Sequence, residues 1–154
     1  MGMTALNILA DVLYDLLKLD GQNVYSRGEY DITKLYNEHR NLNKHKPSNS
    51  SNRFRGPWGG AWQNIHNTDT AVGDDIERIR LTRNELQHSP TYALGDTRFN
   101  ELCDITHDML RRFDQHNRPK KLYSCRFKEV LATIISDEEA KNVRQQFECK
   151  MDTG

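Results

Sequence analysis

Residues 4–18 read TALNILADVLYDLLK, and their pattern decides the fold class. Apolar side chains recur three and four residues apart, as on one face of an α-helix, whereas a strand would alternate apolar and polar positions. The apolar positions are Leu6, Leu9, Val12, Leu13, Leu16 and Leu17. Asp20 and Gly21 follow, and glycine often ends a helix because it tolerates a positive φ. We therefore predict an amphipathic helix that ends close to Gly21.

Four segments further along the chain also show helical periodicity. Residues 31–42 begin with Asp31, a residue type that caps helix N-termini. Residues 73–88 carry acidic side chains in their first turn, where the helix dipole favours negative charge. Residues 96–116 and 124–135 repeat apolar side chains at helical spacing. Because no segment alternates strongly like a strand, the sequence predicts an all-α helical bundle.

The end of the chain contains another helix signal. Ser136 and Glu139 are three residues apart, which is the spacing of a capping box, in which each side chain bonds the backbone N–H of the other residue. We therefore predict that a separate last helix begins at Ser136 and runs to about residue 149, with Val143 and Phe147 as its apolar anchors.

The overall composition narrows the classes of function. The chain has 154 residues, enough for one domain with a core, and a formal net charge of +0, which favours neither nucleic acid nor a membrane surface on bulk charge. Cys103, Cys125 and Cys149 are too widely spaced for a zinc site, so we expect no metal and no other cofactor. The cysteine pattern fits a reducing, cytoplasmic setting, and no apolar stretch approaches the length of a membrane span.

Residues 43–73 form an unusually long connection between two predicted helices. Loops beyond about 15 residues in compact domains are usually functional or disordered. Basic and aromatic side chains are interleaved in this one, and together they can contact the phosphates and stack on the bases of single-stranded RNA. The candidate RNA-binding residues are Lys44, Lys46, Arg53, Arg55, Trp58 and Trp62. The alternative, favoured by the glycines close to both tryptophans, is that Trp58 and Trp62 pin the loop onto the bundle.

Three acidic residues lie at the start of the segment 73–88. Asp74, Asp75 and Glu77 could be metal ligands only if their carboxylates converged on one point. As negative charge at a helix N-terminus they need no further partner. We favour this second interpretation.

The end of the same segment, RNELQH at residues 83–88, contains residue types suited to phosphate chemistry. On a helix, Asn84 and His88 share a face, and Arg83 lies about 100° around the axis from Asn84. A histidine at a helix C-terminus has a raised pKa and can act as an acid, while an arginine offers a planar pair of donors to a phosphate. Two copies related by a two-fold axis would place two such pairs at one cleft. The competing interpretation is that polar residues are ordinary in the last turn of a helix.

The run DDIERIRLTRNELQHS, residues 74–89, resembles the signature helix of HEPN domains, in which an Arg, commonly followed by an Asn, precedes a His by a short interval. It is most similar to the HEPN-like domain of an RNA-binding RING-type ubiquitin ligase family and of related invertebrate multidomain proteins. The resemblance covers roughly residues 5–116. Further matching positions are Gly60, Trp62 and Asp69 before the helix, a helix start at Asp31 to Leu35, and a later motif at Phe99 to Leu102.

This resemblance implies a single HEPN-like domain over residues 1–154, built as an up-and-down bundle of four or five helices with the long loop before the signature helix. Residues 122–150 would be a C-terminal helical extension. The implied activity is metal-independent cleavage of RNA at the cleft of a homodimer, with the 2′-hydroxyl as nucleophile. Arg83 would stabilise the charge of the phosphorane, His88 would be the general acid and base, and Asn84 would orient the phosphate or the histidine.

Other HEPN domains do not cleave RNA and act as binding or assembly modules. The resemblance therefore leaves a second function open, that of a protein-interaction or self-association module in a larger cytoplasmic protein of the ubiquitin-ligase or innate-immune adaptor type. The expected partners are a second copy of the chain, single-stranded RNA or other proteins, and not a membrane.

Overall fold

The computed structural model describes residues 2–21, 23–48, 58–88 and 96–139, and side chains for residues 5–21, 23–48, 58–87 and 97–133. Over this part of the chain there are five α-helices and two short 3-10 helices, and no strand. The α-helices are α1 (Gly2–Leu19), α2 (Ile32–Leu42), α3 (Val72–His88), α4 (Asp96–Asn117) and α5 (Tyr123–Glu139). The predicted all-α bundle is confirmed.

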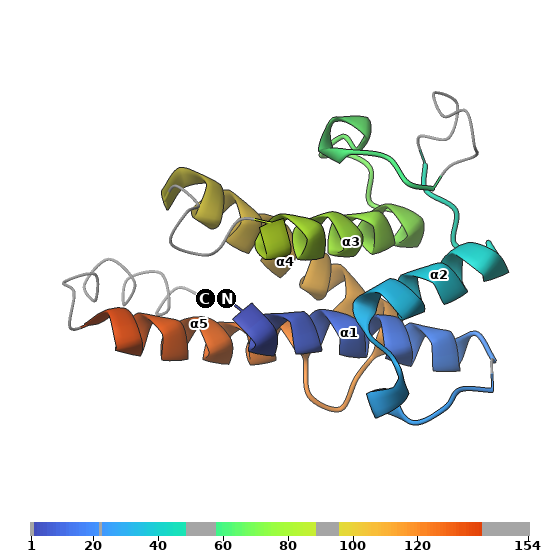
Figure 1. Ribbon diagram of the computed structural model, residues 1–154, viewed down its shortest axis with the longest axis horizontal. Coiled ribbons are helices and arrows are strands. Elements are labelled where there is room, and N and C mark those ends of the chain that lie inside the picture. The colour runs from blue at the N-terminus through green and yellow to red at the C-terminus, as the bar shows by residue number, and fades with distance from the viewer. Residues whose placement is uncertain (1, 22, 49–57, 89–95, 140–154) are drawn as a thin grey trace.

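α1 is the central helix, because it packs against each of the other four. Figure 1 shows α3 and α4 lying together over α1, with α2 crossing near one end and α5 extending past the other. The apolar stripe of α1 is buried, and Val12, Leu13 and Leu16 are each 0% exposed. Burying one such side chain contributes roughly 1.5–3 kcal/mol relative to leaving it in water. The apolar face of the stretch that predicted the fold class therefore lies in the core of the bundle.

The ends of α1 and α2 follow the local signals in the sequence. Gly21 has a φ of 82°, and its N–H donates to the carbonyl of Lys18 at 3.0 Å, so the predicted glycine end of α1 is confirmed. The side chain of Asp31 accepts a hydrogen bond from the backbone N–H of Lys34 at 2.8 Å, which confirms the predicted N-cap of α2. α2 ends at Asn43 in the left-handed region, at φ 51°.

The C-terminal segment differs from the prediction. α5 continues without a break from Tyr123 through Ser136 to Glu139, so the capping box that was to start a separate helix at Ser136 is wrong. A capping residue needs a non-helical backbone, and the α5 sequence has no glycine or proline to interrupt the helix before Ser136. Val143 and Phe147, and the rest of the predicted last helix, lie outside the described residues.

α5 also begins inside the bundle and is not an appendage to it. Tyr123 and Phe127 are each 1% exposed and belong to the same core cluster as side chains from the other four helices. The carboxylate of Asp114 at the end of α4 fixes the entry to α5, since it accepts from Tyr123 N at 2.6 Å and Ser124 Oγ at 2.6 Å. Within the described residues, none of the helices has the length and apolar character needed to cross a lipid bilayer.

α3 lies among α1, α2 and α4 and is also contacted by the described parts of the loop, residues 43–48 and 58–71. Every residue from Gly73 to Ile79 is buried. A Cβ at Gly73 would lie 2.3 Å from the carbonyl oxygen of His45 and 2.5 Å from the backbone nitrogen of Pro47. Glycine at this position therefore lets the loop backbone rest directly on the first turn of α3.

Candidate functional site

The acidic residues at the start of α3 are buried hydrogen-bond acceptors. Asp74 is 1% exposed and accepts from Ser48 N at 2.8 Å, from Ser48 Oγ at 2.6 Å and from Ala71 N at 3.1 Å. The bond from Ala71 satisfies a backbone donor just ahead of the helix, as expected of negative charge at an N-terminus. The bonds from Ser48 have a second effect, because they hold the early part of the loop against α3.

Asp75 joins three segments through two arginines. Its carboxylate accepts from Arg112 of α4 through Nε and Nη2, both at 2.8 Å, and from Arg78 Nη1 at 2.8 Å. Arg78 in turn donates through Nη2 to the carbonyl of His66 in the loop at 3.0 Å. The hydrogen bonds that Arg112 donates to Asp75 raise the pKa of Arg112. A carboxylate that is 2% exposed thus has two cationic partners, as a buried charge requires.

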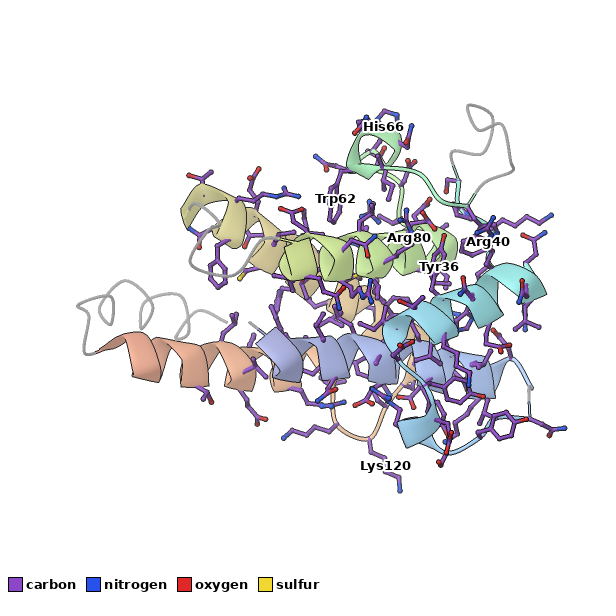
Figure 2. The ribbon with its side chains drawn as sticks, viewed as in Figure 1. Tyr36, Arg40, Trp62, His66, Arg80 and Lys120 are labelled. Carbon is purple, nitrogen blue, oxygen red and sulfur yellow. The ribbon has the colours of Figure 1, made fainter. Side chains whose placement is uncertain are left out.

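Glu77 is the acceptor between α3, α2 and the loop. It is 0% exposed and accepts hydrogen bonds from the hydroxyl of Tyr36, from Arg80 Nη2 at 2.9 Å and from Gly59 N at 3.2 Å. Arg80 also lies over the Tyr36 ring, 5.4 Å from its centroid, and donates to the carbonyl of Gly60. Burial and the bond to Glu77 raise the pKa of Tyr36. Figure 2 shows Tyr36 and Arg80 close together where α2 meets α3.

These contacts correct the interpretation of the acidic cluster. Within the described part of the chain, no group of His, Cys, Asp or Glu side chains could hold a metal ion. Helix-dipole charge accounts for Asp74 in part, but Asp75 and Glu77 are members of buried ion pairs. The sequence contained a signal for this arrangement, because Asp75 with Arg78 and Glu77 with Arg80 are opposite charges three residues apart on a helix. It contained no signal that these pairs would be buried.

Trp58 pins the loop onto the bundle. It is 7% exposed, meets the Tyr36 ring edge-on at a centroid distance of 5.9 Å, and donates through Nε1 to Asn43 Oδ1 at 2.9 Å. The pinning alternative is therefore confirmed for this residue. A ring buried to this extent offers little surface to a nucleobase, so the RNA proposal below does not use Trp58.

Trp62 fixes the other part of the loop to the second half of α3. It opens a 3-10 helix, η2 (Trp62–Asn64), and donates through Nε1 to Glu85 Oε1 at 3.0 Å. Arg98 of α4 binds the same carboxylate at 2.5 and 2.6 Å and lies over the indole, 5.3 Å from its centroid. Its hydrogen bonds lower the pKa of Glu85. Trp62 is half-buried, and Figure 2 shows it between the loop and α3.

The basic candidates of the loop divide into two groups. Lys44 and Lys46 are exposed, and the ammonium of Lys44 lies 3.1 Å from Oδ1 of Asp20 at the end of α1. Arg53 and Arg55 lie outside the described residues. Apart from the buried Trp58, the described RNA-binding candidates are therefore two exposed lysines, one of them in an ion pair, and the half-buried Trp62.

The second half of α3 carries the predicted catalytic residues. Arg83 and Asn84 are half-buried, and Arg83 Nη1 donates to Asn84 Oδ1 at 3.0 Å. His88 is the last residue of α3, and its side chain lies outside the described residues. A separation of five residues turns a side chain about 140° around a helix and moves it about 7.5 Å along the axis. Positions 83 and 88 therefore lie on different sides of α3.

Comparison with known proteins gives no relative: no family model matches the chain, and neither a curated protein nor a solved structure matches it. The likeness to HEPN domains thus depends on the residues of α3 and its neighbours alone.

Proposed function

We propose that the chain is a HEPN-type RNA-binding domain that contacts RNA through the second half of α3, with Arg83, Asn84 and His88 as the functional residues. One observation supports this most directly. The carboxylates of Asp74, Asp75 and Glu77 are occupied in holding α2, α4 and the loop, whereas Arg83 and Asn84 are half-buried and bonded to each other. This pair can turn to a phosphate without breaking the contacts that those carboxylates make between elements.

The chemistry available to these residues is cleavage without a metal. The 2′-oxygen of a ribose attacks the adjacent phosphorus, and the bond to the 5′-oxygen breaks to leave a 2′,3′-cyclic phosphate. His88 takes the proton of the 2′-hydroxyl or gives one to the 5′-oxygen, and Arg83 stabilises the negative charge of the phosphorane. Because positions 83 and 88 of one chain lie on different sides of the helix, the full set at one phosphate requires a second copy across a two-fold axis.

A second candidate function is a non-catalytic interaction or self-association module of a larger cytoplasmic protein, of the ubiquitin-ligase or innate-immune adaptor type. It is favoured by the use of Asp75, Glu77, Arg78 and Arg80 in the fold. A chain could keep these residues to hold its helices together and have no activity on RNA. In the first proposal Arg83 contacts RNA, whereas in the second it does not.

The test uses labelled single-stranded RNA, the purified chain and EDTA, with Arg83→Ala, His88→Ala and Arg111→Ala compared with the wild type. Arg111 is an exposed arginine on α4 and serves as the matched control. The nuclease proposal predicts cleavage by the wild type and Arg111→Ala, and none by the other two variants. Binding without cleavage, weakened by Arg83→Ala only, supports an RNA-binding domain. An absence of both, with the chain dimeric in sedimentation, contradicts the RNA proposal and supports the interaction module.

A further inference from the structure

A cluster of titratable groups lies at the start of the loop, away from the second half of α3. We call it the Asp20 cluster: Asp20, His39, Lys44, His45 and His116. The Asp20 side chain is 4% exposed and accepts from Lys44 Nζ at 3.1 Å and from His45 Nε2 at 3.1 and 3.2 Å. The loop is therefore tied to the end of α1 by two donors that share one carboxylate.

His39 of α2 faces the same carboxylate from inside the bundle. It is 2% exposed, and its Nε2 lies 2.8 Å from the carbonyl oxygen of Leu13. A carbonyl only accepts, so Nε2 carries the proton and Nδ1 is the unprotonated nitrogen of the neutral ring. Nδ1 lies 3.9 Å from Asp20 Oδ2, so a lone pair faces a carboxylate without a hydrogen bond between them. Protonation of His39 Nδ1 would give the ring a second N–H donor and a positive charge, both of which attract the Asp20 carboxylate.

The neighbours of the cluster define what can move. From α2, Glu38 is the other charged group that acts on His39, and from α4 the ring of His116 meets His45 edge-on at 5.9 Å. The backbone of residues 45–47 rests on Gly73 of α3. His39 and Asp20 are almost fully buried on their helices, whereas Lys44 is 57% exposed and His45 is 16% exposed on the loop. The loop is thus the part of the cluster that can leave.

Imidazoles around a carboxylate are also the residue types of a metal site. Within the described residues, however, no such group has the arrangement to hold a metal ion. The geometry instead points to the unprotonated Nδ1 of His39, which faces Asp20 Oδ2 at 3.9 Å.

We propose that the Asp20 cluster is a pH-sensitive anchor of the loop, in which protonation of His39 draws Asp20 away from Lys44 and His45 and frees residues 44–46, while Ser48 stays bonded to Asp74. One proton from water binds Nδ1, the new N–H donates to Asp20, and the bonds from Lys44 and His45 to that carboxylate break.

Linkage gives the direction of the effect. Burial lowers the pKa of His39, the bond to Leu13 and the charge of Asp20 act in the opposite direction, and the charge of His45 lowers the pKa further. When His45 leaves, that last contribution disappears and the pKa of His39 rises. Proton uptake by His39 and departure of the loop therefore favour each other by the same free energy. Acidification opens the anchor, and a return to neutral pH closes it.

The experiment follows the backbone amides of residues 44–46 by NMR in the ¹⁵N-labelled chain, from about pH 7.5 to about pH 5, the range in which histidines titrate. The heteronuclear NOE is the readout, since it reports the mobility of the backbone itself. We expect these amides to lose order with the midpoint of the His39 imidazole, below 6.5. His39→Gln keeps a donor for Leu13 and should hold them ordered throughout. His66→Gln, at an exposed loop histidine outside the cluster, should behave like the wild type.

Three results would overturn the proposal. One is a wild-type transition that persists in His39→Gln, and another is order that survives at residues 44–46 while His39 titrates. The third is loss of order in α1 at the same midpoint, which would mean unfolding of the whole domain. Should His39→Gln not fold, Asp20→Asn tests the same step: the amides should be mobile already at neutral pH and show no transition, and a wild-type transition in this variant also contradicts the proposal.

Discussion

The first half of α3 lies inside the molecule, with every residue from Gly73 to Ile79 buried, whereas the second half has half-buried side chains at Arg83, Asn84 and Glu85. Both halves are rich in charge. In the first half the carboxylates are bonded to α2, α4 and the loop. In the second half Glu85 also accepts a hydrogen bond from the loop, from Trp62. Arg83 and Asn84, by contrast, bond to each other.

The comparison shows that the charged residues of one helix differ in how easily they can change partners. Buried ion pairs are costly to break, because removal of one partner leaves an uncompensated charge away from water. Half-buried polar side chains can exchange partners with little change in the free energy of unfolding. A motif that spans both halves, as the likeness to HEPN domains does, therefore mixes residues that hold the fold with residues that are available to a ligand.

The largest effect is expected at Asp75. Asp75→Ala leaves Arg78, whose side chain is 8% exposed, and Arg112, whose side chain is 34% exposed, without their shared carboxylate. Removing one partner of a buried pair costs about 3–5 kcal/mol, and the exposure of Arg112 places the expected loss near the lower end. Urea unfolding measures it. Glu101→Ala is the control, because Glu101 is 57% exposed and 3.8 Å from Arg98, and it should lose less than about 1 kcal/mol.

The next effect is expected where the loop rests on α3. Gly73→Ala would place a methyl group 2.3 Å from a backbone oxygen, so the loop must move, at a cost of about 1–3 kcal/mol. Gly28→Ala is the matched control, because nothing lies within 4 Å of its added carbon, and its unfolding free energy should stay within about 0.5 kcal/mol of the wild type. Equal losses in the two variants would show that the loop does not press on α3.

The sequence predicts the helices much better than it predicts which charged residues of α3 are buried. Three signals for the helices act over only a few residues: the apolar stripe of α1, the cap at Asp31 and the glycine after α1. Because each signal is local, the sequence is enough to predict it. The burial of Asp75 depends on Arg112, which is 37 residues away. No local pattern specifies that contact. The prediction of a helix start at Ser136 was wrong for a related reason. The capping-box signal is local, but nothing in the preceding residues ends α5 before Ser136.

A smaller effect is expected from pH. The pKa of His39 in the fold is lowered from its ordinary 6.5, so its contribution to stability is complete above that value and is lost as the pH falls below it. One proton can change the free energy of unfolding by at most about 1.4 kcal/mol for each pH unit. Urea unfolding in mildly acidic and neutral buffer should show a flatter dependence in His39→Gln than in the wild type. An identical slope in the two proteins would exclude His39 as the titrating group.

The smallest effect on stability is expected at Arg83, and it gives the most direct test of the difference between the halves of α3. Arg83→Ala is measured twice, by urea unfolding and by binding to single-stranded RNA. We predict an unfolding free energy within about 0.5 kcal/mol of the wild type and RNA binding weakened about tenfold, which corresponds to about 1.4 kcal/mol. Unchanged RNA binding, or a loss of stability as large as that of Asp75→Ala, would contradict the account.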